Sequence, residues 1–163
     1  PILGVNLGHV GVLAAGFAAL PDDQRAEVRR WVDRKDRAAL VSNLAGLDSP
    51  ARAFASLPFV MGRGDTLREA MATAPAEARA GLEHLLAIDA ALTPAERRHI
   101  VYDLGEVRGL DYYTGMHFEI FAAGAGRAIG AGGRYDDLMA RFGRPMPACG
   151  VTLDLDVIAE IDP

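Results

Sequence analysis

The stretch from Val107 to Phe121, "VRGLDYYTGMHFEIF", places an arginine, two adjacent tyrosines, a histidine and a glutamate among apolar residues. A strand that only fills a core needs none of these polar groups. A guanidinium can hold a carboxylate or a phosphate through its planar fork, and a tyrosine hydroxyl can bond to a polar ligand atom. The stretch therefore predicts the lining of a small-molecule site, and its residue types leave open whether that site is catalytic or only senses a ligand.

Each of these side chains also has an ordinary structural interpretation. Arg108, beside Gly109, can be a loop arginine that pairs with Glu106, or it can point into a cleft and hold an anion. Tyr112 and Tyr113 are adjacent, so on a strand they face opposite sides. One of them can pack in the core while the other offers its hydroxyl to a ligand, or both can be plain strand aromatics.

A second unusual stretch is "GAGGRYDDL", residues 130–138, with three glycines in four positions. Glycine weakens a strand unless a ligand or another backbone must come close. No lysine followed by serine or threonine is present, and the G-x-G-x-x-G spacing is not met, so this is not a phosphate loop. A β-bulge is one alternative. We interpret Gly132 and Gly133, with Tyr135 just beyond them, as a flat wall against which a small planar group can lie.

The remaining reactive residues indicate neither a metal nor a cofactor. One cysteine cannot make a disulfide or a thiolate metal site within the chain, and the four histidines lack metal-ligand spacing. We assign no chemistry to His117, and we expect Cys149 to be a small buried residue. A cytosolic protein fits this cysteine usage best, and no apolar run is long enough to cross a membrane.

Composition argues for an ordinary soluble protein: half of the residues are apolar and a quarter are charged. The formal net charge of -5, from 17 basic and 22 acidic residues, argues against a nucleic-acid-binding surface, which needs clustered cations. The first residue is Pro1 rather than methionine, and we expect a fragment or a processed product.

The pattern of apolar residues changes near Thr93. Before it, apolar residues at helical spacing, such as Val28, Trp31 and Val32, predict short helices. The pattern Thr93-Pro-Ala-Glu96 is typical of a capping box. After it, short β-rich runs separated by turns predict an antiparallel sheet with helices packed on it. Further helix starts are expected at Pro21-Asp22, Asp36, Ser49-Pro50 and Asp65-Thr66.

The long motifs resemble a known family. "VRGLDYYTGMHFEIF", "AGGRYDDLMARFG" and "PACGVTLDLDVI" are similar to histidyl-tRNA synthetase, and more closely to its non-translating paralogues, the ATP phosphoribosyltransferase regulatory subunits. "LGVNLGHVGVLAAGF" resembles the latter family too. The resemblance covers essentially the whole chain, although the helical middle is a weaker match than the late motifs.

This resemblance implies an α+β fold: a class II aminoacyl-tRNA synthetase-like antiparallel sheet flanked by helices, with a helical insertion. It implies that residues 1–10 end a preceding core segment, that 11–92 are the insertion, and that 93–163 are the C-terminal part of the core. It also implies a histidine-like pocket without a metal or catalytic residues, lined by Arg108, Tyr112, Tyr113, Gly132, Gly133 and Tyr135.

The sequence departs from the synthetase in its third class motif. There the synthetase has glycine, a hydrophobic residue, glutamate and an arginine that holds the ATP γ-phosphate. The matching run here has Asp154 in place of the glycine and Val157 in place of the arginine. Valine cannot bind a phosphate, and a nearby carboxylate repels one. Since cation stabilisation is usually a large catalytic term, we expect no adenylation.

By resemblance, the chain is part of a non-catalytic regulatory subunit. It would activate a short-form ATP phosphoribosyltransferase catalytic subunit in the first step of histidine biosynthesis and mediate feedback by histidine. A homodimer within a hetero-oligomer is implied, without a cofactor, membrane or nucleic acid. One alternative is an active histidine–tRNA ligase, whose first two motifs would precede Pro1. Another is a structural subunit whose pocket no longer binds histidine.

Overall fold

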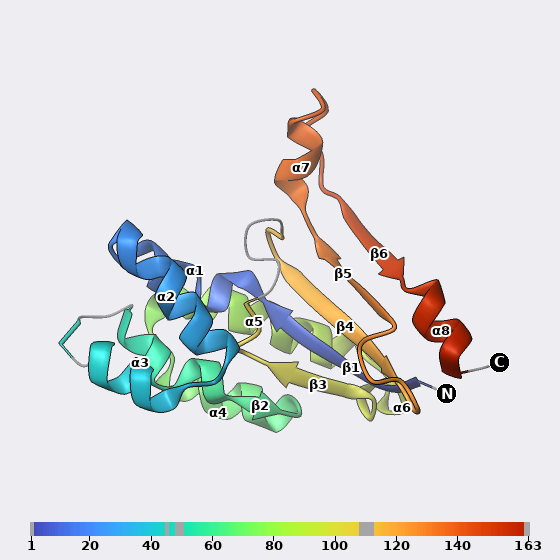
Figure 1. Cartoon of the computed structure of the whole chain (residues 1–163), viewed down its shortest axis with the longest axis horizontal. Coiled ribbons are helices and arrows are strands. Elements are labelled where there is room, and N and C mark those ends of the chain that lie inside the picture. The colour runs from blue at the N-terminus through green and yellow to red at the C-terminus, as the bar shows by residue number, and fades with distance from the viewer. Residues whose placement is uncertain (1, 45, 48–50, 108–112, 162–163) are drawn as a thin grey trace.

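The computed structural model describes residues 2–44, 46–47, 51–107 and 113–161. A six-stranded mixed sheet in the order β2-β3-β1-β4-β5-β6 forms its centre (Figure 1). The strands are β1 (Ile2–His9), β2 (Met61–Gly62), β3 (Ile100–Asp103), β4 (Met116–Ala122), β5 (Gly130–Arg134) and β6 (Cys149–Leu153).

One strand pairing differs from the expected antiparallel sheet. β1 and β3 are parallel, with Val5 opposite Ile100 and Leu7 opposite Tyr102, while the other pairings in the sheet are antiparallel. A parallel pair needs a crossover connection, and the long helical segment between β1 and β3 provides it. The strand-forming pattern revealed β3 itself but not its direction, which depends on how this helical segment returns the chain to the sheet.

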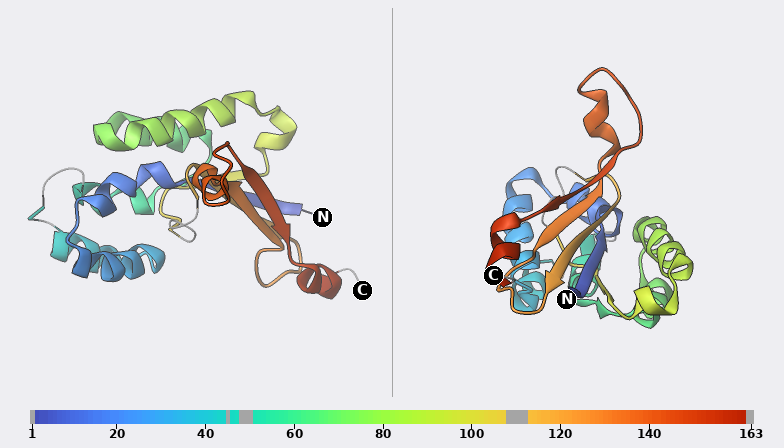
Figure 2. Two further views of the ribbon diagram at one scale, coloured as in Figure 1. Left: turned by 90° about the horizontal axis from the view of Figure 1, so that it is seen from above. Right: turned by 90° about the vertical axis from the view of Figure 1, so that its right-hand side faces the viewer.

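The segment between β1 and β3 is mainly helical, as its apolar spacing predicts. Its helices lie around the β2–β3–β1 side of the sheet, whereas β5 and β6 extend away from them (Figures 1 and 2). The helices of this segment are η1 (Val10–Val12), α1 (Ala14–Ala18), α2 (Asp22–Asp33), α3 (Arg37–Leu44), η2 (Ala51–Ala55), η3 (Leu57–Phe59), α4 (Gly64–Thr73) and α5 (Ala76–Ala91). The short helix α6 (Pro94–Arg97) also precedes β3, and α7 (Asp136–Ala140) and α8 (Leu155–Ile161) follow it.

Side-chain caps explain where several helices begin. The Asp36 carboxylate accepts the backbone N–H of Ala39 at 3.0 Å, which caps α3. Thr93 and Glu96 form the predicted capping box of α6. α4 begins at Gly64, directly before the expected Asp65. The expected start at residues 49–50 lies outside the described residues.

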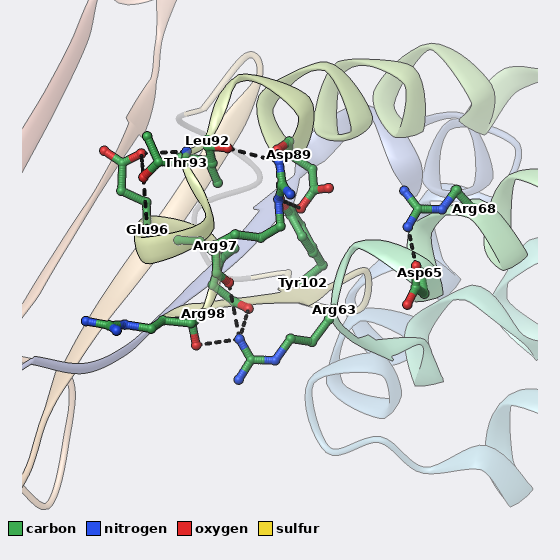
Figure 3. A network of polar contacts seen from close by, with 11 residues as sticks. Arg63, Asp65, Arg68, Asp89, Leu92, Thr93, Glu96, Arg97, Arg98 and Tyr102 are labelled. Carbon is green, nitrogen blue, oxygen red and sulfur yellow. Dashed lines mark hydrogen bonds and ion pairs between the residues drawn. The ribbon is translucent and has the colours of Figure 1, made fainter.

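A polar network ties α5 and α6 to β3 (Figure 3). The buried carboxylate of Asp89 accepts the hydroxyl of Tyr102 at 3.0 Å, while the guanidinium of Arg97 donates to the backbone carbonyl of Asp89. Burial, followed by the bond to Asp89, raises the pKa of Tyr102 above its ordinary value. Arg63 donates to the carbonyls of Arg97 and Ile100. These contacts fix the point at which the chain re-enters the sheet.

Among the residues that the structure describes, two apolar clusters hold the fold. The larger lies between the helices and one face of the sheet and includes Leu7, Phe54, Leu82 and Tyr102. The smaller one joins Ala122 and Ile129 to Val157 of α8. In the described part of the chain, no helix combines the length and the apolar character that a bilayer crossing requires. The expected division at residues 10 and 92 stays a prediction.

Candidate functional site

The second face of the sheet, opposite the larger cluster, carries a row of small residues beneath aromatic rings. Gly133 of β5 lies between His117 of β4 and Gly150 of β6 in the strand register, and His117 in turn lies opposite Gly8 of β1. Residues that lie directly opposite each other in neighbouring antiparallel strands point to the same face of the sheet. These four positions therefore form one continuous strip across the sheet.

Two of the expected tyrosines lie on this strip. A Cβ atom at Gly133 would approach the Tyr113 ring to 2.7 Å, and a Cβ atom at Gly150 would collide with the Tyr135 hydroxyl. A side chain at either position would therefore displace a tyrosine from this face. Gly132 faces the other way, because a Cβ atom there would lie 2.6 Å from the Phe118 ring, which packs against the larger cluster.

The structure thus brings Tyr113, Gly133 and Tyr135 together on one face and places Gly132 on the opposite face. Gly150 lies beside Gly133 on this face, and we call these two glycines the glycine floor. Sequence reasoning missed Gly150, although it stands in the motif "PACGVTLDLDVI". Arg108 and Tyr112 lie outside the described residues. Whether their side chains join this group therefore stays a prediction.

His117, to which the sequence analysis assigned no role, is buried beside Tyr113. It is 3% exposed, and its ring stacks on the Tyr113 ring with centroids 5.7 Å apart and planes 15° from parallel. Gly8 makes room for it, because a Cβ atom there would lie 2.6 Å from the imidazole Cε1. The signal that could have identified His117 is strand alternation, which places it on the same face as Gly133.

A pair of histidines lies at the end of β1. The backbone N–H of Gly11 donates to Nδ1 of His9 at 3.0 Å, so the proton of neutral His9 resides on Nε2. Nε2 in turn lies 3.0 Å from Nδ1 of His84 on α5, to which it can donate. Burial, followed by the charges of His84, His117 and Arg134, lowers the pKa of His9 to about 4. The 75-residue separation of this pair hid it from sequence reasoning.

A polar cluster at the start of α7 holds Tyr135 in place. The Asp136 carboxylate accepts from Arg134 at 2.8 Å and from the backbone N–H of Ala148 at 3.1 Å. The bond from Arg134 lowers the pKa of Asp136. The Thr114 hydroxyl accepts the Asp136 N–H at 2.9 Å. Tyr135 lies between Arg134 and Asp136 in the chain, so this cluster fixes its backbone over the glycine floor.

A cavity of about 770 Å³ opens beside Tyr113. This volume is within the ordinary range for small-molecule sites. Its lining includes Phe17, Arg25 and Arg29 from α1 and α2, together with Tyr113, Thr114 and Asp137.

The residues at the third class motif have a structural role. The Asp154 carboxylate accepts the backbone N–H of Val157 at 3.1 Å, which caps α8, and it also pairs with Arg127. Val157 is 1% exposed and belongs to the smaller apolar cluster. Cys149 was expected to be buried but is exposed. It begins the edge strand β6, whose residues lie largely open to solvent in the described structure.

Together, the mixed sheet, its helical crossover and its glycine-floored face define a class II synthetase-like core. The sequence model of the family described as histidyl-tRNA synthetase matches residues 2–158. The chain therefore belongs to the histidyl-tRNA synthetase family, and the expected family and fold class are confirmed.

Within this family, the chain is similar to curated relatives that are named as regulatory subunits. An ATP phosphoribosyltransferase regulatory subunit from Anaeromyxobacter dehalogenans (strain 2CP-1) is 43% identical over 161 residues, which cover 93% of this chain and 45% of the relative. Another regulatory subunit, from Pseudomonas syringae pv. tomato, is 36% identical over 99% of this chain and 42% of its own length. The chain thus spans less than half the length of these relatives.

The fold is also that of a solved structure described as an ATP phosphoribosyltransferase regulatory subunit/histidyl-tRNA synthetase from Bacillus halodurans. The two superpose with a TM-score of 0.80 at 24% identity over 96% of this chain and 43% of the other. A chain in the ATP phosphoribosyl transferase (HisG:HisZ) complex from Thermotoga maritima gives a TM-score of 0.64 at 22% identity, covering 83% of this chain and 48% of that one.

Proposed function

We propose that this chain is part of the regulatory subunit of an ATP phosphoribosyltransferase and has no adenylation chemistry of its own. The observation that carries the proposal is the burial of Val157 in the smaller apolar cluster, at the position where the synthetase has its ATP-binding arginine. This side chain packs between strand and helix rather than facing a phosphate.

Electrostatics at this motif support the same conclusion. Adenylation is an attack of a carboxylate on a phosphate of ATP with loss of pyrophosphate, and it needs preorganised positive charge where negative charge develops. Here the nearby charged group is the Asp154 carboxylate, which caps α8 and pairs with Arg127. The hydrogen bond from the Val157 N–H, followed by that from Arg127, lowers the pKa of Asp154. The carboxylate therefore stays ionised at neutral pH and keeps Arg127 paired, so this motif presents an ion pair rather than a free cation to a triphosphate.

The proposed partner is a short-form ATP phosphoribosyltransferase catalytic subunit, and the proposed effector is histidine. The names of the curated relatives support the regulatory role, and the similarity to a chain of the Thermotoga maritima HisG:HisZ complex supports assembly with a catalytic subunit. The expected pocket would lie over Gly133 and Gly150, between Tyr113 and Tyr135. For feedback, histidine must bind one state of the complex more tightly than another.

Two measurements on the full-length protein test the proposal. The protein, mixed with a short-form catalytic subunit, should increase the rate of phosphoribosyl transfer to ATP, and histidine should reduce that increase. The same protein alone should not exchange pyrophosphate into ATP when histidine is added. Robust histidine-dependent exchange would instead assign the chain to a histidine–tRNA ligase. Stimulation that histidine does not affect would indicate a structural subunit.

A further inference from the structure

A hollow of about 350 Å³ lies where the chain re-enters the sheet, and its described lining is mostly arginine. Arg63 at the start of α4, Arg97 at the end of α6 and Arg98 directly after α6 line it together with Pro94 (Figure 3). Among the described residues, this arginine hollow shares no lining residue with the cavity beside Tyr113. It is therefore a candidate site of its own.

The arginine hollow carries more positive charge than the nearby carboxylates balance. Arg97 Nε lies 3.5 Å from Oδ1 of Asp89, which is buried. Glu96 adjoins Arg97 in the chain, but its carboxylate accepts the backbone N–H of Thr93 at 2.8 Å and the Thr93 hydroxyl at 2.7 Å. Three guanidinium charges against the single carboxylate of Asp89 leave two positive charges unbalanced. Because like charges repel at short range, an anion in the hollow would be stabilising.

The two unbalanced arginines keep donors for a ligand. In the described part of the chain, Arg63 and Arg98 are exposed and bond to carbonyls and an imidazole ring rather than to carboxylates. Arg63 Nη1 donates to the backbone carbonyls of Arg97 and Ile100 at 3.2 and 3.3 Å, which holds its guanidinium beside the end of α6. Arg98 Nε donates to the His99 ring at 3.1 Å. The described residues thus leave Nε and Nη2 of Arg63, and both terminal nitrogens of Arg98, available.

We propose that the arginine hollow binds a diphosphate group, with Arg63 at one phosphate and Arg98 at the other. A guanidinium binds phosphate oxygens through two parallel N–H bonds, and a diphosphate carries enough negative charge to balance both arginines. Figure 3 shows the Arg98 side chain extending away from the Arg63 guanidinium, so two linked phosphates reach both groups more readily than one does.

The lining also limits the kind of diphosphate. The described residues around the hollow include no aromatic ring on which a base could stack. The ligand is therefore recognised by its phosphates alone, and inorganic pyrophosphate should bind about as tightly as a nucleoside diphosphate. This inference goes beyond the proposed function and does not depend on it.

Calorimetric titration of the full-length protein with inorganic pyrophosphate, in buffer without magnesium, tests the site. The parent should bind a single pyrophosphate per chain, and more tightly than orthophosphate. Arg98→Gln should weaken pyrophosphate binding about tenfold or more, because charge-assisted hydrogen bonds are lost. This variant gives up only the contact with the adjacent His99 in the described structure, so it should keep the fold. Arg63→Lys keeps a donor for the α6 carbonyls but lacks the planar fork, and it should weaken binding as well.

Arg68→Gln is the matched control, because Arg68 is an exposed arginine of α4 that pairs with Asp65 and does not line the hollow (Figure 3). It should bind pyrophosphate as the parent does. Equal affinity in the parent and in Arg98→Gln, or no binding to the parent, would overturn the site. An equal loss in Arg68→Gln would show that only the overall charge matters, which overturns it too.

ADP distinguishes an inorganic ligand from a nucleotide. Similar affinities for ADP and pyrophosphate support the assignment, whereas a strong preference for ADP would overturn it, because a base would then be recognised. The activation assay with the catalytic subunit is independent of these titrations. A failure of the arginine hollow therefore leaves the proposed function standing, and a failure of activation leaves the hollow standing.

Discussion

Lys35 Nζ lies 2.7 Å from Asp103 Oδ1 and 2.8 Å from the backbone carbonyl of Pro58. Lys35 is the only lysine in the chain, and its backbone adopts a left-handed conformation with φ of 53°. Asp103 is buried and also accepts the backbone N–H of Gly105 at 2.8 Å. A Cβ atom at Gly105 would collide with the Pro58 carbonyl and with Lys35 Nζ. One ion pair thus joins the α2–α3 turn, η3 and the end of β3.

The first prediction concerns this ion pair. Lys35→Met should lower the free energy of unfolding by about 3 kcal/mol, because it leaves the Asp103 carboxylate buried without its cation. Urea denaturation followed by circular dichroism measures the change. Arg34→Met is the control, since Arg34 is the neighbouring exposed residue, and it should change the unfolding free energy by less than about 0.5 kcal/mol. Equal stability of the two variants would show that the pair contributes little.

The second prediction concerns the glycine floor. Gly150→Ala should weaken histidine binding to the full-length protein, because the added methyl group displaces the Tyr135 hydroxyl. Tyr135→Phe should weaken binding by roughly one to two orders of magnitude if its hydroxyl bonds to the imidazole. Calorimetric titration compares both with Gly126→Ala, whose new methyl group would meet open space. Full affinity in Gly150→Ala would mean that this face does not hold the ligand.

Local patterns in the sequence predicted the parts of this fold that depend on nearby residues. The Thr93 capping box, the Asp36 cap and the buried Val28–Val32 face follow from short spacings, and all are present. The parallel pairing of β3 with β1 and the exposure of Cys149 depend on which elements pack together in space. The strand pattern did not indicate the first, and the expected burial of Cys149 was wrong.

The candidate site shows the same limit. Tyr113, Gly133 and Tyr135 could be named because they stand in long motifs, and strand alternation relates His117 to them. The contact between His9 and His84 joins β1 to α5, and sequence spacing carries no information about it. The cavity likewise depends on where α2 lies relative to α7, which only the three-dimensional arrangement reveals.

The third prediction concerns pH. The pKa of His9 in the folded protein is about 4, below the ordinary value of 6.5 expected when the chain unfolds. The unfolded chain therefore binds a proton more readily, so stability is highest above pH 6.5 and falls as the pH decreases toward 4. We expect the free energy of unfolding to fall by about 1–2 kcal/mol from pH 7 to pH 5 on account of His9.

His9→Asn isolates this contribution, because asparagine keeps an acceptor for the Gly11 N–H but does not titrate. Urea denaturation of this variant at pH 7 and pH 5 should show a smaller difference in stability than the parent shows. His99→Asn is the control, since its ring accepts from the adjacent Arg98 side chain and lies apart from the His9–His84 pair. A pH dependence in His9→Asn as steep as that of the parent would exclude His9 as its source.

The fourth prediction concerns the third class motif. Val157→Arg restores the residue type of the synthetase, but it should not produce histidine-dependent pyrophosphate exchange, because the position faces the apolar cluster of Ala122 and Ile129. The variant should instead lose about 3 kcal/mol or more of stability, since a charged group enters an apolar environment without a partner. Val157→Ala should cost less, because it removes only packing. Thermal denaturation of the full-length protein measures the loss of stability, and the pyrophosphate-exchange assay measures any adenylation activity. A stable Val157→Arg protein with exchange activity would mean that the position opens toward ATP, and that the valine alone had silenced an otherwise intact synthetase site.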